Sequence, residues 1–316
     1  MSPWLLRRTV EAVATAVLAG VVLVLLLHLL PGDPLAAVLG DHPATPAVEA
    51  ALRRHWGSLA AIFGGLARGN LGVSIVEQRP VTTILAERLG PTLLLGGFTL
   101  LIDFTVGLAL GVWSALHPDT IRARCVGAVT IVGYALPSFV IGMLLVWTFS
   151  LQLHWLPAGG IRDVLLAPDA PFAATLWDHV KHLALPLIAM VMATLAVPLR
   201  QQRAAALTTA AQPWVLAARA RGVSPGWIAW RHCWRPALIP IVTLLGLWLP
   251  MLVAGAVFVE VVFQWPGVGL LLAQATQDRD IPVVIGGGLL LIVMVQLGSL
   301  VADVLYHVVD PAQRRR

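Results

Sequence analysis

Long apolar blocks separated by short polar segments limit the fold of this chain more than any other feature. Hydrophobic residues make up 58% of its 316 residues, and charged residues only 12%. A run of about 18 or more apolar residues is long enough to cross the roughly 30 Å hydrocarbon core of a bilayer as a helix. Because backbone groups in lipid must be hydrogen-bonded within the protein, helices are the expected spanning form. The pattern predicts an all-α integral membrane protein rather than a soluble globular domain.

Six such blocks predict six transmembrane helices within a single membrane domain, residues 1–316. The first block is too long for a signal-peptide core of about 7–15 residues, and no clear small-x-small site closes it. We therefore interpret it as an uncleaved span, with a cleaved signal as the alternative. A polar segment, 31–90, follows it and is expected to be extracytoplasmic. The predicted spans are about 10–30, 91–116, 125–153, 183–199, 236–263 and 282–306.

The basic residues orient these spans. Most of the 21 Lys and Arg residues lie in four short segments, 1–9, 117–124, 200–235 and 307–316. Cytoplasmic segments carry the excess of basic residues in membrane proteins, so both termini are predicted to be cytoplasmic. Cys125 and Cys233 then fall on the reducing side of the membrane, without the spacing of a metal site, and no disulfide is expected.

The segment 200–235 is the longest predicted cytoplasmic piece, and it contains no Asp or Glu. Pro213 suits the first turn of a helix, and Gly222 suits the left-handed residue that ends one. Ser224 followed by Pro225 fits the N-cap and first turn of a second short helix. The segment is therefore predicted to form a cytoplasmic helix-turn-helix.

Three interpretations of this loop compete. It can be an interfacial amphipathic element, with Trp227, Trp230 and Trp234 at the lipid headgroups. It can be a DNA-binding helix-turn-helix, although a loop held between two spans is poorly placed to reach a major groove. It can also be a docking element that inserts into a partner protein. The spacing of the residues leaves the first and third interpretations open.

A family resemblance favours the docking interpretation. The loop resembles the EAA loop of bacterial ABC importer permeases, in the dipeptide, oligopeptide and nickel branch of the binding-protein-dependent transport family. The segments that carry this resemblance are Ala218-Arg219-Ala220-Arg221-Gly222-Val223-Ser224, Trp230-Arg231-His232 and Leu238-Ile239-Pro240. Further segments similar to the family's markers follow one another along nearly the whole chain: Leu30-Pro31-Gly32-Asp33-Pro34, Asn70-Leu71-Gly72-Val73-Ser74, Arg79-Pro80-Val81, Glu260-Val261-Val262-Phe263-Gln264-Trp265-Pro266-Gly267-Val268-Gly269, Arg279-Asp280-Ile281-Pro282-Val283-Val284, and Asp303 with Asp310-Pro311.

The chain departs from the family pattern in two places. Leu216 stands where the general pattern has a glutamate, so no role of that carboxylate carries over. The segment 43–65 lacks the family's usual Gly-Leu-Asp-x-Pro stretch and is shortened, so the family's mode of contact with a binding protein does not carry over to it.

The resemblance implies a type I importer fold, a location in the bacterial inner membrane, and a mechanism in which the loop acts as a lever. No Gly-rich P-loop surrounds Lys181, the only lysine, so ATP and Mg²⁺ are expected on separate ATPase subunits, with no cofactor in this chain. The implied partners are a second homologous permease, ABC ATPase subunits, an extracytoplasmic solute-binding protein and membrane lipid, with no nucleic acid. The residues expected to couple the chain to the ATPase are Ala217, Ala218, Arg219, Arg221, Gly222, Ser224, Arg231 and His232.

The resemblance further implies a non-catalytic subunit that imports short peptides by alternating access. A nickel or metal-chelate permease of the same branch and a non-ABC secondary carrier are the alternatives. A membrane enzyme would need a constellation such as His-x-x-Glu-His or Gly-x-Ser-x-Gly in a span, and none is present.

Three carboxylates in or next to the spans are candidates for the translocation path or a gate: Asp103, Glu260 and Asp303. Such groups usually face a bundle interior or a wet cavity, and a polar lock between helices is the structural alternative. His179, His182 and His154 raise the question of a metal. Because a transition-metal site needs three or four donors, no metal site is expected.

Overall fold

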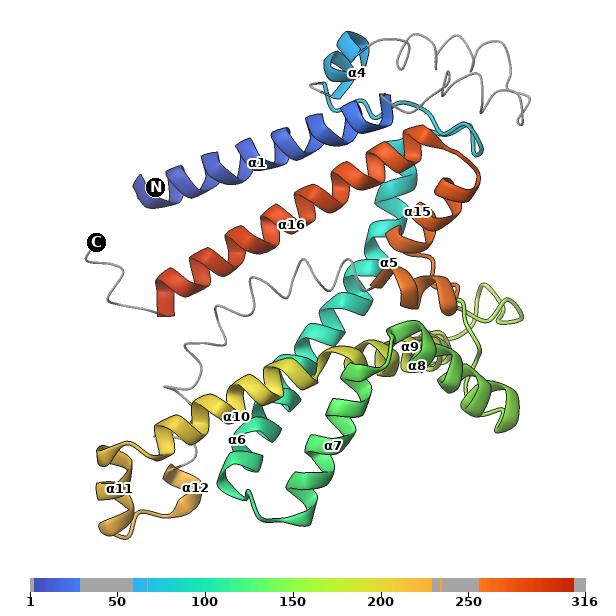
Figure 1. Ribbon diagram of the computed structural model, residues 1–316. Coiled ribbons are helices and arrows are strands. Elements are labelled where there is room, and N and C mark those ends of the chain that lie inside the picture. The colour runs from blue at the N-terminus through green and yellow to red at the C-terminus, as the bar shows by residue number, and fades with distance from the viewer. Residues whose placement is uncertain (1–2, 29–58, 67, 229–233, 235–255, 310–316) are drawn as a thin grey trace. The chain divides into compact units, whose positions relative to one another are not determined.

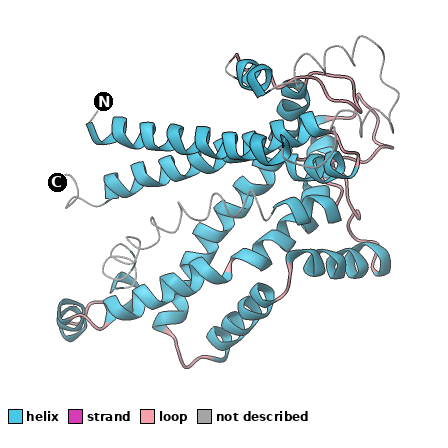
Figure 2. Ribbon diagram, turned by 45° about the horizontal axis from the view of Figure 1, so that its top comes forward, coloured by secondary structure: helices cyan, strands magenta, loops and turns pink. Residues whose placement is uncertain are grey.

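The computed structural model describes residues 3–28, 59–66, 68–228, 234 and 256–309. Apart from one isolated antiparallel bridge between Val73 and Pro80, the regular structure in these ranges is helical (Figures 1 and 2). The predicted all-α architecture is therefore confirmed for this part of the chain. The helices are α1 (Pro3–His28), α4 (Leu59–Leu66), α5 (Val81–Ile102), η1 (Asp103–Gly107), α6 (Leu108–Leu116), α7 (Ile121–Ala135), α8 (Ser138–Leu145), η2 (Val146–Gln152), α9 (Phe172–Thr194), α10 (Ala196–Ala210), α11 (Pro213–Ala220), α12 (Pro225–Trp227), α15 (Val268–Gln277) and α16 (Ile281–Val309).

Three helical stretches of the described chain are long and apolar enough to cross a membrane: Leu6–Leu26, Val81–Leu116 and Ile281–Val301. Two bent helix pairs raise this number to five if each pair counts as one span. Most of the predicted span 236–263 lies outside the described residues, although 256–262 is helical. The helix of the second predicted span begins at Val81, before the expected Pro91, which the helix includes.

Both bent pairs overlap predicted spans, 125–153 and 183–199, in which prolines stand at the bends. The first pair, α7 and α8, bends by 107°. The cause is Pro137, because the residue before a proline is driven to extended backbone, and Leu136 has ψ 137°. The second pair, α9 and α10, bends by 44° at Leu195. There Pro198 has no N–H, and a proline ring crowds the carbonyl four residues earlier, here that of Thr194.

The chain divides into two compact units, Met1–Leu93 with Pro266–Leu297, and Leu94–Trp265 with Gly298–Arg316. In the first unit α1 lies beside α16 (Figures 1 and 2). A Cβ at Gly20 would lie 2.9 Å from Leu289 Cδ2, so a larger residue there would force the two helices apart. The buried apolar side chains of this unit form two clusters, Val24, Ile62, Ile75 and Ile285, and Val81, Ile84, Leu85, Leu271, Ala275 and Val283.

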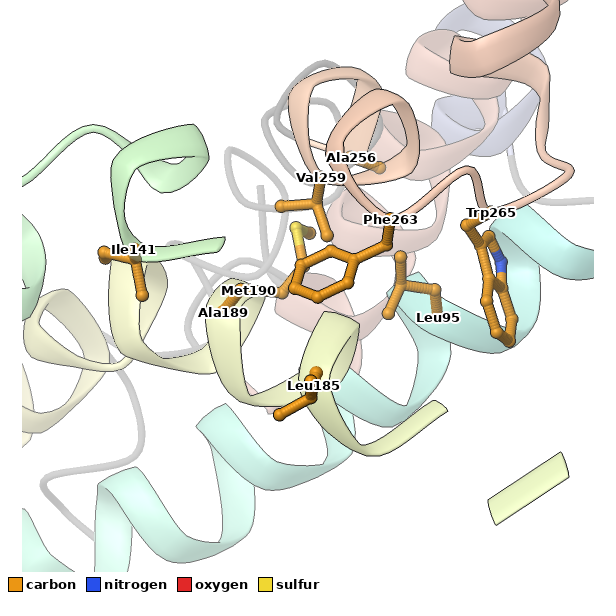
Figure 3. Packing of buried hydrophobic residues seen from close by; sticks show 9 residues of the cluster. All are labelled: Leu95, Ile141, Leu185, Ala189, Met190, Ala256, Val259, Phe263 and Trp265. Atoms are coloured by element: carbon orange, nitrogen blue, oxygen red, sulfur yellow. The ribbon is translucent and has the colours of Figure 1, made fainter. Parts of the chain in front are cut away.

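The second unit has its main core around Phe263, whose ring lies in the middle of the group drawn in Figure 3. Nine buried residues form this cluster: Leu95, Ile141, Leu185, Ala189, Met190, Ala256, Val259, Phe263 and Trp265. Burying a large aliphatic or aromatic side chain stabilises a water-soluble core by about 1.5–3 kcal/mol. In lipid the corresponding gain comes from close packing, since the surroundings are also apolar.

Close packing is clearest where α6 crosses α10. Gly107 and Gly111 are four residues apart and face α10, the spacing by which small residues let membrane helices approach. A Cβ at Gly111 would lie 2.6 Å from the Leu199 carbonyl oxygen and 2.9 Å from Gln202 Cβ. The α10 helix, which leads into α11, is thereby packed tightly against α6.

Candidate functional site

The residues 212–228, called here the α11–α12 loop, follow α10 at its carboxyl end (Figure 1). Gln212 is extended, with ψ 144°, and Pro213 occupies the first turn of α11. The helix ends at Ala220, and Gly222, two residues later, has a φ of +78°, the left-handed conformation predicted for it. Two backbone bonds close this end, from Gly222 N to Arg219 O at 2.9 Å and from Val223 N to Ala218 O at 3.2 Å. The predicted helix, break and helix are confirmed.

The second helix, α12, is a single short turn. Ser224 Oγ accepts a long hydrogen bond from Trp227 N at 3.4 Å, as an N-cap does, and Ser224 O accepts one from Ile228 N at 3.0 Å. Arg231, His232 and Trp230 lie outside the described residues.

The α11–α12 loop has an inner and an outer face. Val215 and Ala218 are buried, and Val215 packs against Ile228 across the turn. Ala217, Arg219 and Arg221 are exposed. The two alanines that the sequence presented together are therefore on different faces: Ala218 contributes to the fold of the loop, and Ala217 faces outward.

The outer face combines apolar and basic side chains. Leu216 is 51% exposed and Trp227 56% exposed, and Arg221 and Arg219 are exposed as well. Arg219, four residues after the buried Val215, also lines a cavity on the α6 side of the loop. Neither arginine forms an ion pair with any residue that the structure describes. Exposed aromatic, aliphatic and arginine side chains in one small area are typical of the centre of a protein interface. A surface of this composition is complementary to a groove with acidic side chains, since the segment 200–235 has none of its own.

A second candidate site lies in the first unit, where two of the sequence markers meet. Asp280, buried and directly preceding α16, accepts a hydrogen bond from Ser74 Oγ at 2.5 Å. Its carboxylate also accepts from Ile75 N at 3.2 Å and Val76 N at 3.3 Å. A carboxylate with several N–H and O–H donors can be buried without a paired cation. The sequence presented both segments as separate markers, and nothing in it indicated that they touch.

The loop that Asp280 holds is short and tightly turned. Asn70 Oδ1 accepts from Gly72 N at 2.9 Å, and Gly72 has a φ of +79°. Nearby, Arg79 donates hydrogen bonds to Glu77 and Glu87. The Glu87 carboxylate, as the strongest influence, raises the pKa of the Arg79 guanidinium above its usual value. The loop therefore carries a fixed charge pattern on a rigid frame.

The three candidate pathway carboxylates lie on three different helical segments. Asp103 is fully buried in η1, a π-helical turn in the middle of the stretch Val81–Leu116. Glu260 is fully buried in 256–262, next to the core residue Val259. Asp303 is half-buried on α16. Short π-helical insertions in long helices are frequent at functional positions, which singles out Asp103 among the three.

His179 and His182 lie within hydrogen-bond distance of carbonyl oxygens one turn earlier in α9. His182 Nδ1 lies 2.9 Å from the Asp178 carbonyl oxygen and 3.2 Å from Asp178 Oδ1. His179 Nδ1 lies 2.7 Å from the Thr175 carbonyl oxygen. Among the described residues, no three His, Cys, Asp or Glu side chains come close enough together to hold a metal.

Sequence reasoning missed one close approach beside the Phe263 core. Gly160 N donates to Phe263 O at 2.8 Å, and a Cβ at Gly159 would collide with the same carbonyl. The neighbouring glycines Gly159 and Gly160 were the available signal, because a glycine pair often marks a place where two backbones touch.

Comparison with known proteins identifies the family. Residues 107–315 match the family described as the binding-protein-dependent transport system inner membrane component. A putative peptide permease protein of Brucella ovis is 35% identical over 300 residues, covering 92% of each chain. The di/tripeptide transport system permease protein DppB of Pseudomonas aeruginosa is 34% identical over 92% of each chain. The glutathione transport system permease protein GsiC of Escherichia coli is 32% identical over 99% of each chain. The chain belongs to this family of inner-membrane permease components.

Proposed function

We propose that this chain is a permease subunit of an ATP-driven ABC importer that moves short peptides across the bacterial inner membrane. It has six spans and cytoplasmic termini, and it works with a second homologous permease, ABC ATPase subunits and an extracytoplasmic solute-binding protein. Similarity over more than nine-tenths of the chain to permeases named for peptides, di- and tripeptides and glutathione supports the substrate class.

The outer face of the α11–α12 loop carries this proposal. This face combines the exposed Ala217 with exposed basic and apolar side chains, and the buried Val215 and Ala218 keep the loop folded. ATPase closure pushes this face, and the movement passes along α10 to α6 through the tight crossing at Gly111. A packed crossing of this kind transmits a displacement because its backbones are already in contact. The spans then rock between inward-open and outward-open states.

The two sides of the membrane have different tasks in this mechanism. The Asp280-held loop offers the binding protein a rigid docking surface on the extracytoplasmic side. Asp103 and Glu260 are assigned to the translocation path or a gate. Asp303 has the same assignment nearer the cytoplasmic end. An ionised carboxylate at the bilayer centre costs about 2.5–3.5 kcal/mol, which a path lined with water offsets.

The proposal is tested with the purified importer in vesicles. The permease is produced together with the ATPases, partner permease and binding protein encoded beside it. ATP-dependent uptake of labelled dipeptide, tripeptide, glutathione and nickel ion is then measured in parallel. We expect uptake of the short peptides that requires both ATP and the binding protein. Uptake of nickel alone, or solute movement by this chain without an ATPase, would contradict the assignment.

A further inference from the structure

A cavity of about 960 Å³ lies between α6 and the α11–α12 loop, within the second unit. Its walls are mainly apolar, with Val112, Trp113 and Leu116 on α6, and Val223 and Ile228 on the α11–α12 loop. Arg219 and His117 are the cationic or basic side chains that line it. Ligand cavities in proteins typically enclose about 300–1,000 Å³. This cavity, called here the α6 cavity, is therefore large enough for a substantial molecule.

The polar groups of the α6 cavity favour an anion. Arg219 forms no ion pair with any described residue, and the segment 200–235 around it has no acidic residue. His117 Nδ1 lies 3.0 Å from the Trp113 carbonyl oxygen. Because a carbonyl oxygen only accepts, Nδ1 carries a proton, and Nε2 donates to an anion only in the doubly protonated, cationic form of the ring. His117 is also stacked on Trp113, with ring centroids 5.8 Å apart, so its position is fixed.

The position of the α6 cavity at the end of an apolar stretch indicates an occupant that is both apolar and anionic. Leu116 ends the apolar stretch Val81–Leu116, and the segment 117–124, with Arg122 and Arg124, follows directly. On the proposed function, this is the level of the cytoplasmic headgroups. Anionic lipids are enriched there, and basic pockets between spanning helices bind their headgroups. A soluble phosphate would use Arg219 but would leave the apolar walls uncovered.

We propose that the α6 cavity binds an anionic phospholipid, with its phosphate at Arg219 and His117 and an acyl chain along Trp113, Val112 and Ile228. The lipid links α6 to the α11–α12 loop, the two elements between which the push of the ATPase passes. Coupling of ATP hydrolysis to uptake therefore depends on anionic lipid. The dependence of coupling on anionic lipid rests on the proposed function. Binding of lipid in the α6 cavity is tested separately, by a measurement that does not involve transport.

Photolabelling tests occupancy directly. The full importer is placed in vesicles that contain a phosphatidylglycerol with a photoreactive group in its acyl chain, and labelled peptides are mapped by mass spectrometry. We expect label on the peptide that contains Trp113. Ala109 is exposed and lines the α6 cavity, so Ala109→Phe fills the apolar space and should abolish this label. Val106→Phe is the matched control, since Val106 is exposed on the adjoining η1 and is not among the lining residues.

The headgroup is tested by charge removal. Arg219→Gln should reduce the label about fivefold, the effect of one basic residue near an anionic membrane surface. Arg122→Gln, outside the α6 cavity, should leave the label unchanged. Equal label with a photoreactive phosphatidylcholine, or label unaffected by Ala109→Phe, would overturn the proposal. Label that appears on the isolated chain but is lost in the full importer would show that a partner subunit fills the cavity, which also overturns it.

Transport measurements distinguish the proposal of a lipid site from the assignment of the chain to an importer. Uptake per ATP hydrolysed should fall when vesicles of phosphatidylcholine alone replace vesicles that include phosphatidylglycerol. Specific label with no ATP-driven uptake of any peptide would contradict the proposed function and leave the lipid site standing. Full uptake in both lipids with no label on the Trp113 peptide would reject the lipid site and leave the importer assignment intact.

Discussion

The Asp280 carboxylate and the Ser74 hydroxyl are hydrogen-bonded at 2.5 Å although 206 residues separate them in the chain. The same carboxylate accepts from two backbone N–H groups of the Ser74 loop and makes a long contact of 3.5 Å with Val283 N in the first turn of α16. One side chain thus caps a helix and anchors the loop 70–81. The loop 70–81 and the start of α16 consequently move together.

Replacing Asp280 by asparagine should loosen this loop. The amide keeps the shape but turns one acceptor into a donor that faces the N–H and O–H donors, and each bond to a charged group contributes about 1.5–3 kcal/mol. We expect faster proteolysis within 70–81 and weaker stimulation of ATP hydrolysis by the binding protein, with basal ATP hydrolysis retained. Asp278→Asn, at an exposed carboxylate two residues earlier, is the control. Equal behaviour of the two variants would mean that Asp280 does not hold the loop.

Gly222 should tolerate asparagine better than alanine. An added Cβ there meets nothing within 4 Å, so a side chain causes no steric clash with neighbouring residues. The free-energy cost of a substitution comes instead from the left-handed backbone, at φ +78°. For most L-residues the left-handed conformation costs about 1–2 kcal/mol, and asparagine is less penalised. Gly222→Ala should raise the number of ATP molecules hydrolysed per peptide imported, with membrane insertion unchanged. Gly222→Asn should give a ratio close to that of the unmodified protein. Identical ratios in both variants would argue that the turn at Gly222 has no part in coupling.

The crossing of α6 and α10 should be sensitive to size at Gly111. Its neighbours there include the Leu199 carbonyl and the Arg203 backbone nitrogen, 2.6 and 3.2 Å from an added Cβ. Because backbone atoms cannot rotate away, Gly111→Leu must separate the helices, and overpacking of this kind costs about 1–3 kcal/mol. We expect a lower melting temperature in detergent and poor coupling. Gly127→Leu on α7, where an added Cβ meets nothing within 4 Å, should change neither.

The sequence predicted the helix and the glycine turn of the α11–α12 loop. Helix starts and stops such as Pro213 and Gly222 depend on a few neighbouring residues, so a short segment contains the information. The family markers identified the class of protein. The two faces of α11 were not predicted, because Ala217 and Ala218 differ only in what lies beside them. Loops on membrane proteins show no periodicity strong enough to separate such faces.

Features that depend on distant parts of the chain were missed, because a short segment does not contain the information that determines them. Hydropathy reports how apolar a segment is and not whether it is straight, so the angles of the bends at Pro137 and Leu195 could not be predicted. The Ser74–Asp280 bond joins segments whose proximity only the tertiary fold creates. The small residues Gly107 and Gly111 can be read from the sequence. The sequence does not show that they face α10 rather than lipid.

The most direct test of the account places a photoreactive amino acid, p-benzoylphenylalanine, at position 217 of the assembled importer. Ala217 lies on the outer face of the α11–α12 loop, and position 129, exposed on α7, is the control. If this face drives transport, irradiation at position 217 yields a covalent adduct with an ABC ATPase subunit, and irradiation at position 129 does not. An adduct with the extracytoplasmic binding protein, or no adduct with an ATPase in an importer that is active, would contradict the account.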